Sequence, residues 1–156
     1  MEEISVISRK AADLLAKRSH FRKELERKLL KRGFSETNIQ VVLDNFEERG
    51  YINDSDCALF YIEELKRKRI GKFQAIKRLT DRGLERSLAT KLASTFFLEN
   101  DEIEHIRYLL DKRKFELKDI KGLKKALDFF LRRGFEQSII IKVFKNHVPG
   151  GFEGED

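Results

Sequence analysis

The sequence predicts an all-α protein built as an elongated array of three tandem three-helix repeats. Residues that favour helices, such as Leu, Lys, Arg, Glu and Ala, are abundant, whereas the 156 residues include only nine Gly and one Pro. The single proline is Pro149, so no proline interrupts a helix through most of the chain. No alternating run of β-branched residues bounded by turn residues indicates a strand. A short motif centred on glycine recurs at a spacing of about fifty residues, which indicates repeats.

The recurring motif is a charged residue followed by Arg, Gly and an apolar residue. It occurs at Lys31–Phe34, Asp81–Leu84 and Arg132–Phe135, and its glycines lie 50 and 51 residues apart. Flanking residues agree at the same offsets: Leu29 with Leu79 and Phe130, Thr37 with Ser87 and Ser138, Val42 with Leu92 and Val143, and Gly50 with Asn100 and Gly151. We therefore divide the chain into repeat one (1–53), repeat two (54–99) and repeat three (100–149). The glycine-rich, acidic segment 150–156 is predicted to be disordered.

Each repeat is expected to contain a helix, a turn, a basic helix, a glycine turn and a third helix. In repeat one these helices are predicted near Arg9–Lys17, at about His20–Arg32 and from Ser35 onward, with Ser19 as the cap of the second helix. In the second helix apolar residues recur at every fourth position and are expected to face inward: Phe21, Leu25 and Leu29. The bases on the opposite side are expected to face solvent: Lys23, Arg27 and Lys31. The later repeats are expected to begin at Asp54 and near Asn100 or Asp101, with the first loop of repeat three near Lys114–Gly122.

The net charge of +6 is unevenly distributed along the chain. Each middle helix is basic, with eight bases and one acid in Leu65–Arg82, eight and two in Lys17–Arg32, and nine and three in Lys112–Arg133. The segment Ser35–Asp56, by contrast, has one base and six acids. A single charge run is usually just a solvated surface. Repetition at aligned positions favours a second interpretation, in which the basic helices share one face that binds an extended polyanion or an acidic groove.

The candidate partner-binding residues are the bases that align between repeats one and two, together with two neighbours. They are Arg22 with Lys72, Arg27 with Lys77, Lys28 with Arg78, Arg32 with Arg82, and the adjacent Arg67 and Lys68. Repeat three keeps a base at one of these four positions, Arg133. We expect Arg27, Lys28, Lys77 and Arg78 to be exposed.

Other functional classes find little support in the residues. The three histidines, His20, His105 and His147, have no second His or Cys at a metal-ligand spacing, so no metal site is predicted. Cys57 is the only cysteine and lies in an apolar stretch, which indicates a buried core residue, excludes an internal disulfide and fits a reducing cytoplasm. The longest apolar run, Cys57–Ile62, is too short to span a membrane. The sequence therefore predicts a cytoplasmic protein that is not an enzyme and has no cofactor.

Four aromatic residues could in principle stack on the bases of a nucleic acid: Tyr51, Phe60, Tyr61 and Phe73. Aromatic residues at helical spacing more often belong to the core, and this is the interpretation that the sequence favours.

The ordered set of motifs in the first two repeats resembles the bacterial RecX family. The resemblance rests on Ala12–Leu25, Lys28–Phe34, Ile39 with Val42 and Leu43, and Glu48–Asp54, and continues through Lys68, Gly71, Ile76, Leu79 and Arg82–Leu84. It covers residues 9–95 well and 100–147 loosely. The chain departs from the family pattern at Asp56–Ala58, at Ala75 and in its acidic C-terminal tail.

The resemblance implies a cytoplasmic monomer that regulates the RecA recombinase. It implies binding in the groove of the RecA filament on single- or double-stranded DNA, with inhibition of strand exchange, ATP hydrolysis and co-protease action in recombination and DNA repair. It implies no catalytic residue. Two other readings remain: a stand-alone nucleic-acid-binding protein of tandem helix-turn-helix-like units, and a helical adaptor resembling ubiquitin-associated domains, which also have a glycine-aromatic turn like Gly33–Phe34.

Overall fold

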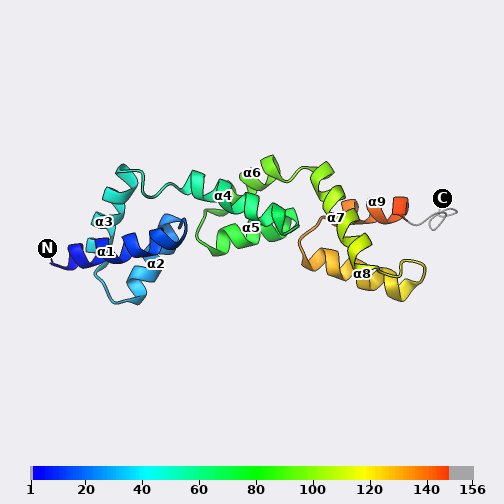
Figure 1. Ribbon diagram of the computed structural model, residues 1–156, viewed down its shortest axis with the longest axis horizontal. Helices are drawn as coiled ribbons and strands as arrows, with labels where there is room; N and C mark the ends of the chain where they lie inside the picture. Colours follow the sequence, from blue (N-terminus) through cyan, green and yellow to red (C-terminus); the bar gives the residue numbers. More distant parts are fainter. Residues whose placement is uncertain (1, 148–156) are drawn as a thin grey trace. The chain divides into compact units, whose positions relative to one another are not determined.

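The computed structural model describes residues 2–147, and in this part of the chain α-helices are joined by short turns, with no β-strand (Figure 1). The predicted all-α class of three successive three-helix groups is confirmed. The segment predicted to be disordered, 150–156, lies outside the described residues. The helices are α1 Glu2–Lys17, α2 Arg22–Lys31, α3 Glu36–Glu48, α4 Asp54–Arg67, α5 Lys72–Asp81, α6 Arg86–Phe96, α7 Glu99–Arg113, α8 Ile120–Arg132 and α9 Gln137–His147.

Two predicted helix starts are wrong, and both have a physical reason. Helix α1 begins at Glu2, well before Arg9, because Glu2 and Glu3 place negative charge in its first turn, where the helix dipole favours it. Ser19 does not cap α2, since the helix begins at Arg22 after Phe21 in an extended conformation. The carboxylate of Glu24 accepts a hydrogen bond from the Phe21 backbone N–H at 3.3 Å and so replaces part of the missing cap. The third helix was predicted from Ser35 onward, and α3 begins at Glu36 with Ser35 as its N-cap residue.

Each terminal three-helix group encloses its own apolar core. In the first group, the predicted stripe of α2 is fully buried and packs with α1 and α3 through residues such as Ile7, Ile39 and Leu43. The bases opposite that stripe, Lys23, Arg27 and Lys31, are exposed as predicted. In the last group the core is aromatic, and Phe130 lies 5.9 Å from both Phe135 and Phe144 between ring centroids.

The aromatic residues predicted to be core are mostly exposed, so that interpretation is wrong for three of the four. Tyr51, Phe60 and Phe73 are 59%, 67% and 53% exposed, and only Tyr61 is half-buried. In α4 the buried side is taken by Cys57, Ala58, Ile62 and Leu65, which leaves Phe60 on the solvent side. Cys57 itself is buried as predicted, and burial raises the pKa of its thiol to about 11.

The chain forms two compact units that do not coincide with the predicted repeats. The N-terminal unit comprises residues 2–61 with 79–88, and the C-terminal unit comprises 62–78 with 89–147, so the middle three-helix group contributes to both. The division of the sequence into repeats at 53/54 and 99/100 stays a prediction. No helix among residues 2–147 has the length and apolar character that crossing a membrane requires.

Candidate partner-binding surface

The arginine of the recurring glycine motif donates hydrogen bonds to the preceding repeat at two places, which we call joints. The arginines are Arg82 and Arg133. Within the N-terminal unit, Arg82 Nη2 donates to the Ser19 carbonyl at 3.0 Å and to Glu24 Oε1 at 3.3 Å. Within the C-terminal unit, Arg133 Nε donates to the Arg69 carbonyl at 2.7 Å, and its Nη2 donates to the Lys68 carbonyl. Ser19 and Arg69 are corresponding positions, 50 residues apart. Two successive repeats therefore use the same joint.

The glycine of the motif permits close approach at each joint. A Cβ on Gly83 would lie 2.9 Å from Lys23 Cβ, and a Cβ on Gly134 would lie 2.3 Å from the backbone nitrogen of Gln74. A Cβ on Gly33 would meet no atom within 4 Å. All three have a positive φ, +87° at Gly33, +114° at Gly83 and +98° at Gly134, which ends the middle helix in each repeat.

A carboxylate from the next repeat caps each of the first two middle helices. Asp54 Oδ1 accepts from the backbone N–H of Arg22 at 2.9 Å, and Glu102 Oε1 accepts from that of Lys72 at 2.7 Å. Arg22 and Lys72 occupy the same position in their repeats. Because the first N–H groups of a helix lack partners within it, these carboxylates satisfy donors and favour the helix dipole. The two caps explain why the basic helix begins where it does in the first two repeats.

Glu24 is the centre of the joint in the N-terminal unit. It is 8% exposed and lies between two guanidiniums, with Arg18 Nη2 at 2.6 Å from Oε2 and Arg82 Nη2 at 3.3 Å from Oε1. Burial alone would raise the pKa of this carboxyl, but the hydrogen bonds and charges of Arg18 and Arg82 outweigh it and lower the pKa to about 2. The Arg82 guanidinium also lies 4.2 Å from the centroid of the Tyr61 ring.

His20 is held neutral beside this joint. Its Nδ1 lies 3.0 Å from the Arg18 carbonyl oxygen and therefore carries the proton, so Nε2 accepts from Lys28 Nζ at 2.9 Å. Burial lowers the pKa of His20, and the neighbouring positive charges of Arg18 and Lys28 act in the same direction. Lys28 is thus engaged inside the protein.

The predicted partner-binding residues fall into two classes. Arg27, Arg32, Arg67, Lys68 and Lys77 are exposed. Lys28 and Arg78 are half-buried, so the expectation that both would be exposed is wrong, and Lys72 is half-buried as well.

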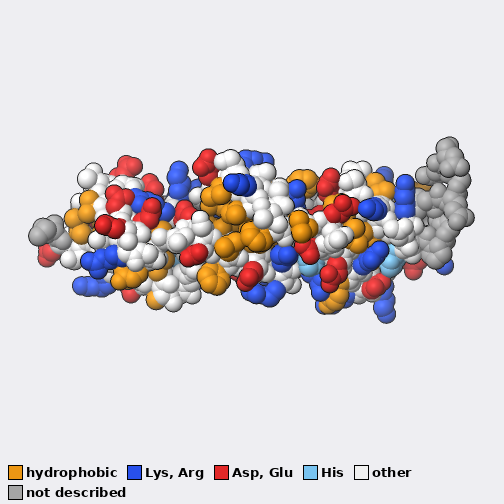
Figure 2. All heavy atoms as spheres, turned by 90° about the horizontal axis from the view of Figure 1, so that it is seen from above, with side chains coloured by type: hydrophobic (Ala, Val, Ile, Leu, Met, Phe, Trp, Pro, Cys, Tyr) orange, Lys and Arg blue, Asp and Glu red, His pale blue; other side chains and the backbone are white. Residues whose placement is uncertain are grey.

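Arg22 and Arg82 are held by acids, with side chains 22% and 20% exposed. Arg22 pairs with Asp44 at 2.6 Å and Glu47 at 2.9 Å, because the acidic α3 lies beside the basic α2. On the face drawn in Figure 2, Lys and Arg side chains lie among Asp and Glu side chains.

The structure also brings together basic residues that the alignment of repeats did not select. Lys125, Arg132 and Arg133 of the α8 region line one hollow with Arg78 of α5, and all four belong to the C-terminal unit. Of these, only Arg78 was a candidate residue. Arg133 aligns with Arg82 but was not selected, because repeat three has Leu123, Asp128 and Phe129 at the other three aligned positions. The signal that could have found them is the spacing of Lys125, Phe129 and Arg133, four residues apart on a predicted helix.

Arg82 and Arg32 occupy the same position of the motif, but only Arg82 belongs to a joint, so their replacement should affect stability differently. Arg82→Ala is expected to lower the free energy of unfolding by about 2–3 kcal/mol, because it leaves the buried Glu24 with one partner fewer. Arg32→Ala should change it by less than about 0.5 kcal/mol, since Arg32 is exposed. Urea unfolding of the two variants measures the difference, and equal losses would contradict the structural role of Arg82.

The sequence and the fold both match proteins named RecX. The pattern of the family described as RecX, first three-helix domain, matches residues 9–46. The Regulatory protein RecX of Xanthomonas axonopodis pv. citri is 32% identical over 133 residues, which cover 84% of this chain and 81% of that protein. That of Caldanaerobacter subterraneus subsp. tengcongensis is 31% identical over 123 residues, 79% of this chain and 61% of the relative, so the chain spans less than two thirds of that relative's length.

A solved structure supports the fold independently. The crystal structure of RecX from Lactobacillus salivarius is similar with a TM-score of 0.78 over 93% of this chain and 96% of that chain, at 19% sequence identity. The sequence likeness over most of the chain and the shared succession of helices agree. The chain belongs to the RecX family of regulatory proteins.

Proposed function

We propose that this chain regulates the RecA recombinase by binding its filament on DNA and lowering its ATP hydrolysis, strand exchange and co-protease action. The observation that carries the proposal is membership of the RecX family, with 32% identity over 84% of the chain to a relative named Regulatory protein RecX. In this proposal the protein acts as a cytoplasmic monomer, contacts DNA weakly or through the filament, and is a binding protein with no catalysis of its own.

The exposed subset of the predicted bases supplies the contacts in this proposal. Arg27 and Lys77 lie on the middle helices, and Arg67 and Lys68 lie where α4 ends. Exposed positive charges attract acidic protein surfaces and phosphates over the Debye length and so raise the association rate. Arg22 and Arg82, already held by acids, are assigned to the fold instead.

The test is ATP hydrolysis by the cognate recombinase on single-stranded DNA, titrated with the wild-type chain and with a variant carrying Arg27, Arg67, Lys68 and Lys77 replaced by Glu. The wild type is expected to lower the hydrolysis rate. The variant should need at least about tenfold more protein for the same effect, because like charges across an interface repel.

The matched control replaces four other exposed bases, Arg9, Lys91, Arg107 and Lys145, by Glu, so that the net charge changes equally. We expect this control variant to lower ATP hydrolysis at nearly the same protein concentration as the wild type. Hydrolysis unaffected by the wild-type chain would contradict the proposed function. Equal weakening by both variants would contradict the assignment of the contact residues, and helical circular dichroism would verify that all three proteins are folded.

A further inference from the structure

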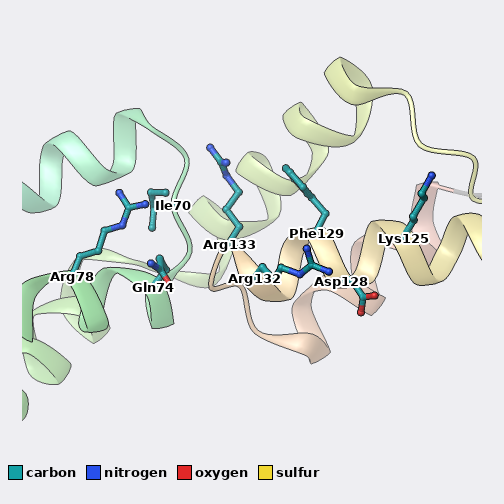
Figure 3. A pocket seen from close by; sticks show the side chains of 8 residues that line it. All are labelled: Ile70, Gln74, Arg78, Lys125, Asp128, Phe129, Arg132 and Arg133. Carbon is teal, nitrogen blue, oxygen red and sulfur yellow. The ribbon is translucent and has the colours of Figure 1, made fainter. Parts of the chain in front are cut away.

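The C-terminal unit contains a basic hollow between α5 and α8 that the proposed function does not use. It has a volume of about 470 Å³, and its lining includes Arg78 from α5 and Lys125, Asp128, Phe129, Arg132 and Arg133 from the α8 region (Figure 3). Four bases against one acid give this surface a local excess of positive charge. A hollow of this size admits a ligand of the dimensions of a nucleotide.

Three of these residues form a stripe along one side of α8. Lys125, Phe129 and Arg133 are four residues apart, and in Figure 3 their side chains extend from α8 toward the same side. Four residues of α-helix advance by about 6 Å, so the two bases lie on either side of the aromatic ring along the helix axis. Arg78 approaches the same hollow from α5 (Figure 3).

The positive charge here is not compensated as it is in the N-terminal unit. There Arg18, Arg22 and Arg82 each contact a carboxylate, whereas among residues 2–147 no ion pair includes Arg78, Lys125, Arg132 or Arg133. The Arg133 guanidinium donates to backbone carbonyls instead. Burial lowers the pKa of Arg133, and the positive charges of Arg113 and Arg78 lower it further. An anionic ligand would relieve this repulsion.

Phe129 adds an aromatic platform to the charged surface. Its ring is half-buried and held by Phe115 and Phe130, with centroids 5.3 and 5.0 Å away. The guanidiniums of Arg113 and Arg133 lie 4.6 and 5.7 Å from its centroid. Nucleic-acid bases stack on aromatic rings and on guanidinium planes alike, whereas Asp and Glu side chains have no aromatic ring to stack. The combination therefore favours a nucleic acid over an acidic protein segment.

A second hollow extends the surface beyond Phe129. It has a volume of about 550 Å³ and shares Lys125 and Phe129 with the first. It adds three bases, Arg113, Lys114 and Lys121, and two acids, Glu116 and Asp119, so bases remain in excess. Proteins that bind single strands combine a basic groove, which follows the phosphates, with aromatic side chains that take successive bases. The two adjoining hollows have both features along α8, with further bases from α5 and α7.

We infer that α8 and the facing end of α5 form a direct binding site for single-stranded nucleic acid, in which Arg78, Lys125 and Arg132 contact phosphates and Phe129 stacks on a base. This inference rests on the proposed function for its biological role, because the site would give the regulator a direct contact with the DNA of the filament. Its test contains no recombinase, so the site and the proposed function can fail separately.

The experiment measures the fluorescence anisotropy of a labelled 20-nucleotide oligothymidylate titrated with the full chain at several NaCl concentrations. The triple variant Arg78→Gln, Lys125→Gln, Arg132→Gln is expected to bind at least about tenfold more weakly. Its slope of log K against log salt should be smaller by about 2, because each lost phosphate contact removes about 0.7 from the slope for a single strand. Phe129→Leu, which keeps apolar contact with Phe115 and Phe130, should weaken binding at least about fivefold with an unchanged slope.

The matched control replaces three exposed bases of the same unit that line neither hollow, Lys91, Arg107 and Lys145, by Gln. It should bind within about threefold of the wild type. No binding by the wild type, or equal loss in the triple variant and the control, would overturn the inference. It would also be overturned if a labelled polyglutamate peptide bound the wild type as tightly as the oligonucleotide, since the groove would then recognise acidic protein segments.

Discussion

Replacing Gly134 by alanine is expected to lower the free energy of unfolding by about 3–5 kcal/mol, whereas the same change at Gly33 should cost about 1 kcal/mol. Both glycines have a positive φ, +98° and +87°, so alanine strains the backbone at both positions. Only at Gly134 would the new Cβ also lie 2.3 Å from the backbone nitrogen of Gln74. Backbone atoms cannot move aside as the end of a flexible side chain can, so the joint itself must open.

Urea denaturation followed by circular dichroism measures the two losses on otherwise identical chains. Two backbone hydrogen bonds lie at this joint and can be followed individually. Gly71 N–H donates to the Arg133 carbonyl at 3.0 Å, and Phe73 N–H donates to the Gly134 carbonyl at 2.9 Å. In Gly134→Ala the amides of Gly71 and Phe73 should exchange with solvent faster. Equal destabilisation by the two substitutions would show that the close approach at Gly134 contributes nothing.

Neutralising Glu24 is expected to have the next largest effect. Glu24→Gln should lower the free energy of unfolding at pH 7 by about 3 kcal/mol, because Arg18 and Arg82 then face each other without the buried carboxylate between them. Glu63→Gln, at an exposed position on α4, is the matched control and should change stability by less than about 0.5 kcal/mol.

The same residue predicts a pH dependence. The pKa of Glu24 is lowered in the folded protein from an ordinary 4.5 to about 2, so its stabilising contribution is complete above about pH 5 and disappears as the pH falls toward 2. The difference in unfolding free energy between the wild type and Glu24→Gln should therefore shrink as the pH falls through this range. A difference that stays constant from pH 7 to pH 3 would contradict the lowered pKa.

The local structure of this protein is largely contained in its sequence. The four-residue spacing of Phe21, Leu25 and Leu29 predicted the buried side of α2, and the three motif glycines predicted where the middle helices end. These features depend on helical periodicity and on the φ angles that glycine permits, both of which act within a few residues. The family resemblance also rests on short local motifs in a fixed order, and it was confirmed.

The functions of the individual bases could not be predicted in this way. Arg32 and Arg82 occupy the same place in the same motif, yet Arg32 is exposed and Arg82 pairs with a carboxylate 58 residues earlier in the chain. The second repeat was predicted to begin at Asp54, and this residue does begin α4, but its carboxylate also accepts from the backbone N–H of Arg22 at the start of α2. A repeat alignment finds equivalent positions. It does not show which of these positions contacts a carboxylate of another repeat, and that contact determines whether the charge is paired.

The most direct test of the proposed role is co-sedimentation of the wild-type chain with preassembled RecA filaments on single-stranded DNA, compared with the same DNA alone and with RecA alone. We predict that the chain sediments with the filament to a greater extent than with RecA alone or with the single-stranded DNA alone, to which it binds more weakly. A chain that stays in the supernatant with the filament, or that sediments equally with naked DNA, would contradict regulation through the filament.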